Sequence, residues 1–107
     1  MSRCELFIQL LKMLDNEQID FARELLANNN LKNKELFEYH DQDGNTLLHR
    51  YLVKNKPEIV RFLIYNGAEV NVLNKDGWLP FHLAVFCSAD INILQCIVDA
   101  SHGKYTR

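Results

Sequence analysis

The chain has 107 residues, of which 48% are hydrophobic and 24% are charged, and these proportions exclude disordered, collagen-like and membrane-embedded chains. The net charge is -2 and the basic residues are scattered, so the electrostatic signature of nucleic-acid binding is absent. No apolar run approaches the roughly 20 residues that span a bilayer, and no signal peptide is visible, so we expect no membrane partner and an intracellular protein, cytoplasmic or nuclear.

The N-terminal part of the chain, up to Asn30, carries two segments with apolar residues at helical spacing. The first begins with Ser2 and Glu5, the spacing of a capping box, and is broken at Asp15-Asn16. The second runs from Ile19 to the asparagine run at 28–30. We therefore predict a helix pair, followed by a longer and more charged connection over residues 31–40.

An internal repeat organises the rest of the chain. Asp43-Gly44 recurs as Asp76-Gly77, and His49 recurs as His82 at the same spacing of 33 positions. Each copy is followed by a helical pattern, a break and a second helical pattern. Because a fixed period of this length marks one supersecondary unit, we predict two tandem helix pairs.

The first unit covers residues 41–73. Its first helix has the apolar face Leu48, Tyr51 and Leu52, and its second helix begins at Pro57, because proline suits a helix start. Asn66-Gly67 ends that helix, since both residues tolerate a left-handed backbone. The alternating segment 68–72 is predicted to be a hairpin-like connector.

The second unit repeats this plan one residue out of register. Its first helix has the apolar face Phe81, Ala84 and Val85. Leu63-Ile64 of the first unit correspond to Ile97-Val98, which lie one position later than the spacing of the Asp-Gly turns would place them. We place the extra residue in the turn at 87–90.

The shared motif carries a family resemblance. Residues 41–73 supply Asp41, Gly44, Thr46, Leu48, His49, Val60, Leu63, Ile64, Gly67, Ala68, Val70 and Asn71. Residues 74–100 supply Gly77, Pro80, Phe81, His82, Leu83 and Ala84. This pattern resembles the ankyrin-repeat family, which has a period of about 33 and a T-P-L-H-x-A core. Leu47 in place of proline, Tyr51 in place of alanine, Asn55 in place of glycine and Leu79 in place of threonine depart from it.

The resemblance implies an all-α fold, an ankyrin-repeat solenoid of three helix-turn-helix pairs with short hairpin-like connectors. Residues 1–40 would form a divergent N-terminal capping repeat and connector, 41–73 one repeat, and 74–107 a repeat with a divergent C-terminal end. Structural motif positions then fall on Gly44, Thr46, His49, Gly67, Gly77, Pro80 and His82. We expect both histidines to tie a turn to its helix, Asn55 to adopt the left-handed conformation, and Tyr51 to push neighbouring helices apart.

The same resemblance implies a protein-protein interaction module that acts as an adaptor or competitive inhibitor and is not an enzyme. It maps partner-binding positions onto Gln42, Asp43, Asn45, Val53, Lys54, Asn66, Lys75, Asp76, Trp78, Phe86 and Cys87. Trp78 is expected to be partly exposed, either as a binding hot spot or packed on the neighbouring turn. Phe86 is expected either in the core or at the contact surface, and its apolar neighbours Phe81, Val85 and Cys87 favour the core. The stretch 48–52 resembles small ankyrin proteins of viruses and intracellular bacteria.

The interpretation of the reactive side chains as catalytic or metal-binding residues has weaker support. Asp41 and Asp43 form a turn, where aspartate caps backbone N–H groups, and His40 and His102 stand alone. Cys4, Cys87 and Cys96 are an odd count without C-x-x-C spacing, so we expect three core thiols, no disulfide framework and no zinc site. No catalytic motif occurs, so we expect no metal and no cofactor, although a small enzyme or metal-binding protein stays a remote alternative.

The last predicted helix is apolar on most sides, whereas a solenoid needs a polar face on its terminal repeat. Its apolar residues are Ile91, Ile93, Leu94, Cys96, Ile97 and Val98. We expect this edge to be covered by the tail 101–107, by a partner or second copy, or by further repeats. The last possibility favours an alternative in which the chain is the recognition domain of a larger enzyme or effector.

Overall fold

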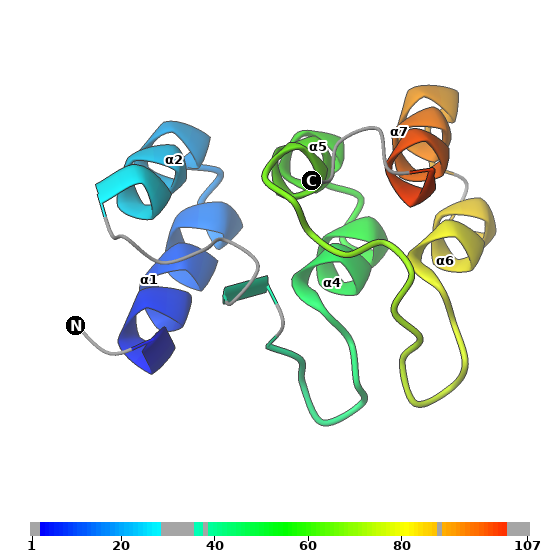
Figure 1. Ribbon diagram of the computed structural model, residues 1–107, viewed down its shortest axis with the longest axis horizontal. Helices are drawn as coiled ribbons and strands as arrows, with labels where there is room; N and C mark the ends of the chain where they lie inside the picture. The colour runs from blue at the N-terminus through cyan, green and yellow to red at the C-terminus, as the bar shows by residue number, and fades with distance from the viewer. Residues whose placement is uncertain (1–2, 29–35, 38, 88, 103–107) are drawn as a thin grey trace.

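Six helices account for most of the computed structural model, which describes residues 3–28, 36–37, 39–87 and 89–102. They are α1 (Arg3–Asp15), α2 (Ile19–Asn28), α4 (Leu47–Val53), α5 (Pro57–Tyr65), α6 (Pro80–Phe86) and α7 (Ile91–Ser101). Figure 1 shows them in two rows, α1, α4 and α6 in one and α2, α5 and α7 in the other. No strand occurs in these ranges, and the predicted all-α solenoid of helix pairs is confirmed.

The N-terminal pair packs through one face of each helix. Leu6, Leu10 and Leu14 are buried along α1, and Ala22 and Leu26 are buried on α2. The break between the helices is a tight turn in which Glu17 has a positive φ of 58°. The predicted capping box cannot be followed here, because Ser2 lies outside the described residues.

The first repeat unit begins and ends as its turn chemistry predicts. Thr46 caps α4, and Pro57 stands in the first turn of α5. Asn55 adopts the expected left-handed conformation with a φ of 56°, and Gly67 ends the unit's second helix with a φ of 92°. In the connector that follows, Ala68 and Val70 are buried while Glu69 is exposed, which matches the alternating pattern.

The register shift in the second unit is confirmed. Helix α6 begins at Pro80 and α4 at Leu47, a spacing equal to that of the Asp-Gly turns, whereas Ile91 at the start of α7 lies one position further from Pro57 at the start of α5. The extra residue therefore lies between α6 and α7. Helix α6 packs on α4 and helix α7 packs on α5, so the second unit stacks on the first.

Several burial predictions are wrong for the outermost parts of the stack. Phe81 and Val85 are 36% and 53% exposed, and only Ala84 of the expected face of α6 is buried. Cys4 in the first turn of α1 and Cys87 at the end of α6 are exposed, whereas Cys96 is buried. The reason is positional, because helix ends and the outer side of the last described helix pair, α6 and α7, have no neighbour among the described residues.

No helix within the described ranges is long and apolar enough to cross a bilayer.

Candidate partner-binding surface

Two turns project from the row that contains α4 and α6 (Figure 1), and both have the same internal hydrogen bonds. One carboxylate oxygen of Asp41 accepts from the backbone N–H groups of Asp43 and Asn45, at 2.9 Å each. In the second turn Asn74 replaces Asp41, and its amide oxygen accepts from the N–H groups of Asp76 and Trp78 at 3.0 and 2.9 Å. We call these two turns, residues 41–45 and 74–78, the turn tips.

The carboxyl group of Asp41 acts in turn formation. The N–H of Asn45, with that of Asp43, lowers the pKa of Asp41 below its ordinary value, because both hydrogen bonds favour the carboxylate. This arrangement confirms the prediction of side-chain capping for Asp41, whereas Asp43 takes part through its backbone N–H and carbonyl.

The turn tips are also bonded to each other. The backbone N–H of Lys75 donates to the carbonyl of Asp43 at 2.9 Å, and the side-chain amide of Asn74 donates to Asn45 at 2.9 Å. A Cβ on Gly44 would lie only 3.0 Å from the backbone nitrogen of Lys75, so this approach requires glycine. The two tips consequently form one preorganised surface.

His49 ties the turn before it to α4, as predicted, and it also fixes the second tip to the first unit. Its Nδ1 accepts from the backbone N–H of Thr46 at 3.2 Å, so the ring proton lies on Nε2. Nε2 then donates to the carbonyl of Trp78 at 2.9 Å. The ring is fully buried, so its role is structural.

His82 does not repeat this arrangement, which corrects the prediction for the second histidine. Its side chain is exposed, and no hydrogen bond joins it to another residue of the described ranges. Two differences explain this: Leu79 has no hydroxyl to cap α6, and no following turn within those ranges supplies a carbonyl like that of Trp78.

All eleven predicted partner-binding residues are at least partly accessible. Asn45, Asn66 and Trp78 are half-buried, and the other eight are exposed: Gln42, Asp43, Val53, Lys54, Lys75, Asp76, Phe86 and Cys87. Ten of them belong to the turn tips or to the ends of α4 and α6. Asn66 stands apart, because it ends α5 in the other row of helices (Figure 1), where its amide donates to the carbonyl of Phe62 at 2.7 Å.

Trp78 and Phe86 form an aromatic pair in which Phe86 is exposed and Trp78 is half-buried. Their ring centroids are 5.3 Å apart in an edge-to-face arrangement. Phe86 is 72% exposed, so the expectation that it belongs to the core is wrong. Trp78 is partly exposed as predicted, and its ring contacts Phe86 of its own unit.

A polar cluster of Asp15, Arg50, Tyr51 and Lys54 joins α1 to α4, and sequence reasoning missed it. The Tyr51 hydroxyl donates to Asp15 at 2.8 Å, and the same carboxylate lies 3.1 Å from Arg50 and 3.4 Å from Lys54. The only available signal was the tyrosine at a position where the family has alanine. Whether Tyr51 spreads the helices stays a prediction.

Opposing effects act on the ionisation of this cluster. Burial alone would raise the pKa of Asp15, but the hydrogen bond from Tyr51 and the charges of Arg50 and Lys54 outweigh it and lower that pKa. Burial, with the hydrogen bond to Asp15, raises the pKa of Tyr51. The hydroxyl therefore stays protonated and continues to donate.

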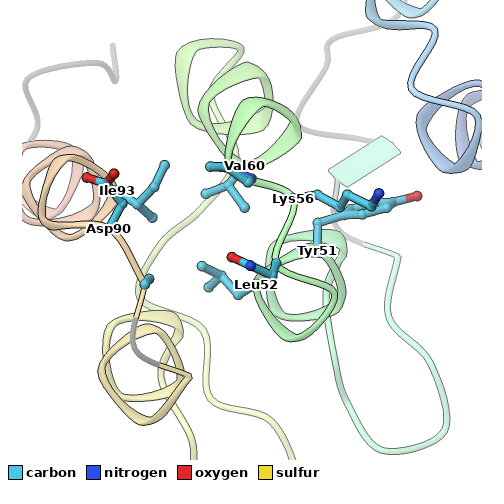
Figure 2. A pocket seen from close by; sticks show the side chains of 9 residues that line it. Tyr51, Leu52, Lys56, Val60, Asp90 and Ile93 are labelled. Atoms are coloured by element: carbon cyan, nitrogen blue, oxygen red, sulfur yellow. The ribbon is translucent and has the colours of Figure 1, made fainter.

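The cavity between the two repeat units is too small for a substrate. Its volume is about 30 Å³, room for roughly one or two water molecules. In Figure 2, Leu52 and Val60 point towards Ile93 across the gap, while Tyr51 points away from it. A search of the described residues finds no group of three His, Cys, Asp or Glu side chains that could hold a metal ion.

Comparisons with known proteins agree with this architecture. Residues 48–98 match the family described as ankyrin repeats (many copies). The chain is 32% identical over 65 residues to the Notch-regulated ankyrin repeat-containing protein of Homo sapiens, covering 61% of this chain and 57% of that protein. It thus spans little more than half of that relative.

Bacterial and viral relatives are also found, which agrees with the resemblance predicted from residues 48–52. A putative ankyrin repeat protein of Rickettsia bellii is 32% identical over 90 residues, covering 84% of this chain but only 13% of its own length. A putative ankyrin repeat protein of Fowlpox virus is 45% identical over 53 residues, covering 49% of this chain and 15% of its own length.

Proposed function

We propose, from the premise that this chain belongs to the ankyrin-repeat family, that it binds a partner protein through the turn tips and the exposed ends of α4 and α6. Ankyrin repeats are generally protein-protein interaction modules. The observation that carries the proposal is the Trp78–Phe86 pair beside two tips that are bonded to each other. A rigid aromatic anchor loses little conformational entropy on binding.

The chemistry of the proposed surface suits a protein partner with a mixed polar rim. Asp43, Lys75 and Asp76 are exposed charges on the tips, and they would supply the polar rim that a typical interface has around its core. The chain would act by occupying the partner's surface, as an adaptor or a competitive inhibitor without catalysis. Exposed free thiols at Cys4 and Cys87 support a reducing intracellular compartment, cytoplasmic or nuclear.

Affinity capture from cell lysate tests the aromatic pair. Trp78→Ala and Phe86→Ala are each expected to weaken capture of the bound protein by about 30-fold or more, the loss typical of a hot-spot residue. Phe21→Ala is the matched control, because Phe21 is 57% exposed but lies on α2 in the other row of helices. The captured proteins are identified by mass spectrometry, and their affinity is then measured with purified components.

The variants separate the possible outcomes. Proteins retained by Phe21→Ala and lost by both tip variants would support the proposal. Proteins retained by all three variants would place the interaction elsewhere and overturn it. Circular dichroism melts of each variant verify that the fold is intact, which is expected because only the backbone of Trp78 takes part in the tip hydrogen bonds.

A second candidate is a recognition unit within a longer protein. It is favoured by the match to the Rickettsia bellii protein, in which the similar segment is a small part of the whole. Sequencing of the mature transcript tests it: a reading frame that continues into another domain would support this candidate, and a stop codon after Arg107 would exclude it.

A further inference from the structure

Within the described residues, nothing packs on one side of the helix pair α6–α7, and the internal repeat shows what such a side packs against. We call this side the end face and define it as Phe81, His82, Val85, Leu94 and Val98. The equivalent residues of the first unit, one repeat earlier, are Leu48, His49, Leu52, Val60 and Ile64. All five are buried, none more than 5% exposed, because the second unit stacks on them.

The end face keeps the character of a stacking surface while remaining open. Phe81 and Val85 are 36% and 53% exposed, whereas their equivalents Leu48 and Leu52 are buried. A groove of about 300 Å³ runs along this side, lined among others by Phe81, His82 and Val98. In the first unit, the place beside His49 that corresponds to this groove beside His82 is occupied by the Trp78 backbone carbonyl. That carbonyl accepts a hydrogen bond from Nε2 of His49 at 2.9 Å.

We propose that the end face binds the exposed first turn-helix-helix unit of another ankyrin-type protein. That unit would stack on α6 and α7 as this chain's second unit stacks on α4 and α5. Its inner helix would cover Phe81 and Val85, and its turn would offer a backbone carbonyl to Nε2 of His82. The proposal concerns a different surface from the turn tips and is independent of the proposed function.

A second copy of this chain is the less suitable occupant. Its second unit is already stacked on its first. Its first unit is held to α1 through Asp15, which accepts from Tyr51 at 2.8 Å and pairs with Arg50 at 3.1 Å. A copy would have to break one of these contacts before either of its repeat units could stack, whereas an ankyrin protein with an open N-terminal side has no such contact to break.

Binding to a designed probe tests the proposal. The probe is a consensus ankyrin-repeat protein from which the N-terminal capping repeat has been deleted, and the same protein with its cap is the control. Isothermal titration calorimetry is expected to detect binding of the uncapped probe alone. Val85→Glu is expected to weaken that binding by about a hundredfold, since a carboxylate would be buried unpaired, and His82→Ala by about tenfold through one lost hydrogen bond.

Phe86→Ala is the matched control variant. Phe86 is an exposed aromatic residue on the same helix, but its equivalent Val53 stays 61% exposed although the second unit is stacked beside it. Stacking does not cover this position, so probe binding should be unchanged by Phe86→Ala while lysate capture through the turn tips is lost. Val85→Glu should show the opposite pattern, which distinguishes failure of one proposal from failure of the other.

Three results would overturn the inference. One is the absence of binding to the uncapped probe at concentrations up to about 100 μM, the weak limit for a specific interface. Another is equal binding of the capped and uncapped probes. The third is a dimer in analytical ultracentrifugation that Val85→Glu dissociates, which would assign the end face to a second copy of the chain.

Discussion

His49 and His82 occupy the same motif position but have different surroundings. His49 is buried between Thr46 and the Trp78 carbonyl, whereas His82 is exposed. The motif specifies which residue is present, and the neighbouring unit decides whether that residue contributes to stability. The ring at position 49 is therefore a part of the interface between repeats.

Replacement of the two histidines should show this difference. His49→Ala leaves the Thr46 N–H without a partner, removes one of the two hydrogen bonds that the Trp78 carbonyl accepts, and opens a cavity, so the free energy of unfolding should fall by about 2–4 kcal/mol. His82→Ala should change it by less than about 0.5 kcal/mol, as is usual for an exposed residue. Urea unfolding followed by circular dichroism measures both values, and equal losses would contradict the assigned roles.

At the scale of the elements, the helix boundaries follow from short-range chemistry and were predictable. Pro57, the left-handed Asn55 and the extra residue between α6 and α7 were all expected from the sequence, because each depends on residues within a few positions. The Asp-Gly motif likewise predicted both turns, and the family resemblance mapped most of the candidate surface onto them. What it did not reveal was the bonding of one tip to the other, which joins residues 29 positions apart.

The burial of side chains on the last described helix pair could not be predicted either, because it also depends on contacts with segments far away in the sequence. The spacing of Phe81 and Val85 is that of a core face. It predicts correctly that the segment is helical and that both side chains lie on the same side of the helix. Whether such a face is covered depends on the next unit, about which the helix itself carries no information. Asp15 was missed because its partner Tyr51 is 36 positions away and on another helix pair.

Replacement of the turn glycines by alanine tests how closely the two turn tips approach each other. Gly44 and Gly77 both have positive φ, at 75° and 81°, so alanine should cost about 1–2 kcal/mol of unfolding free energy at either position. At Gly44 the added Cβ also meets the Lys75 backbone at 3.0 Å, while at Gly77 nothing lies within 4 Å. Gly44→Ala should therefore be the more destabilising by about 1 kcal/mol or more.

Urea unfolding of the two alanine variants measures this difference directly, since the conformational strain is common to both. If the two variants lose the same stability, the close approach of the turn tips does not persist in solution.

At the scale of the whole molecule, the stack is held together in two different ways. The second unit joins the first through buried apolar side chains and the His49 hydrogen bond. Between the N-terminal pair and the first unit, a polar contact contributes as well, because Asp15 accepts from Tyr51 and pairs with Arg50 and Lys54. The junction with the N-terminal pair therefore contains a carboxylate, Asp15, that can be protonated in acid.

The Asp15 junction should weaken in acid. The pKa of Asp15 is lowered in the folded chain, and that of an unfolded aspartate is about 3.9. The stabilisation is therefore fully present above about pH 4 and is lost as the pH falls through the lower folded-state value. Asp15→Asn keeps an oxygen that can accept from Tyr51 but removes the charge, so it should destabilise the protein at neutral pH and lose that difference in acid.

Comparison of the wild type and Asp15→Asn by urea unfolding at several pH values between about 3 and 7 isolates this effect, because the acid response of Asp41 is common to both proteins. The gap in unfolding free energy should close below about pH 4. Salt should also reduce it at neutral pH, since the Asp15 side chain is 34% exposed and its ion pairs are screened. A gap that is constant across this range would mean that the carboxylate charge contributes nothing to holding the N-terminal pair on the stack.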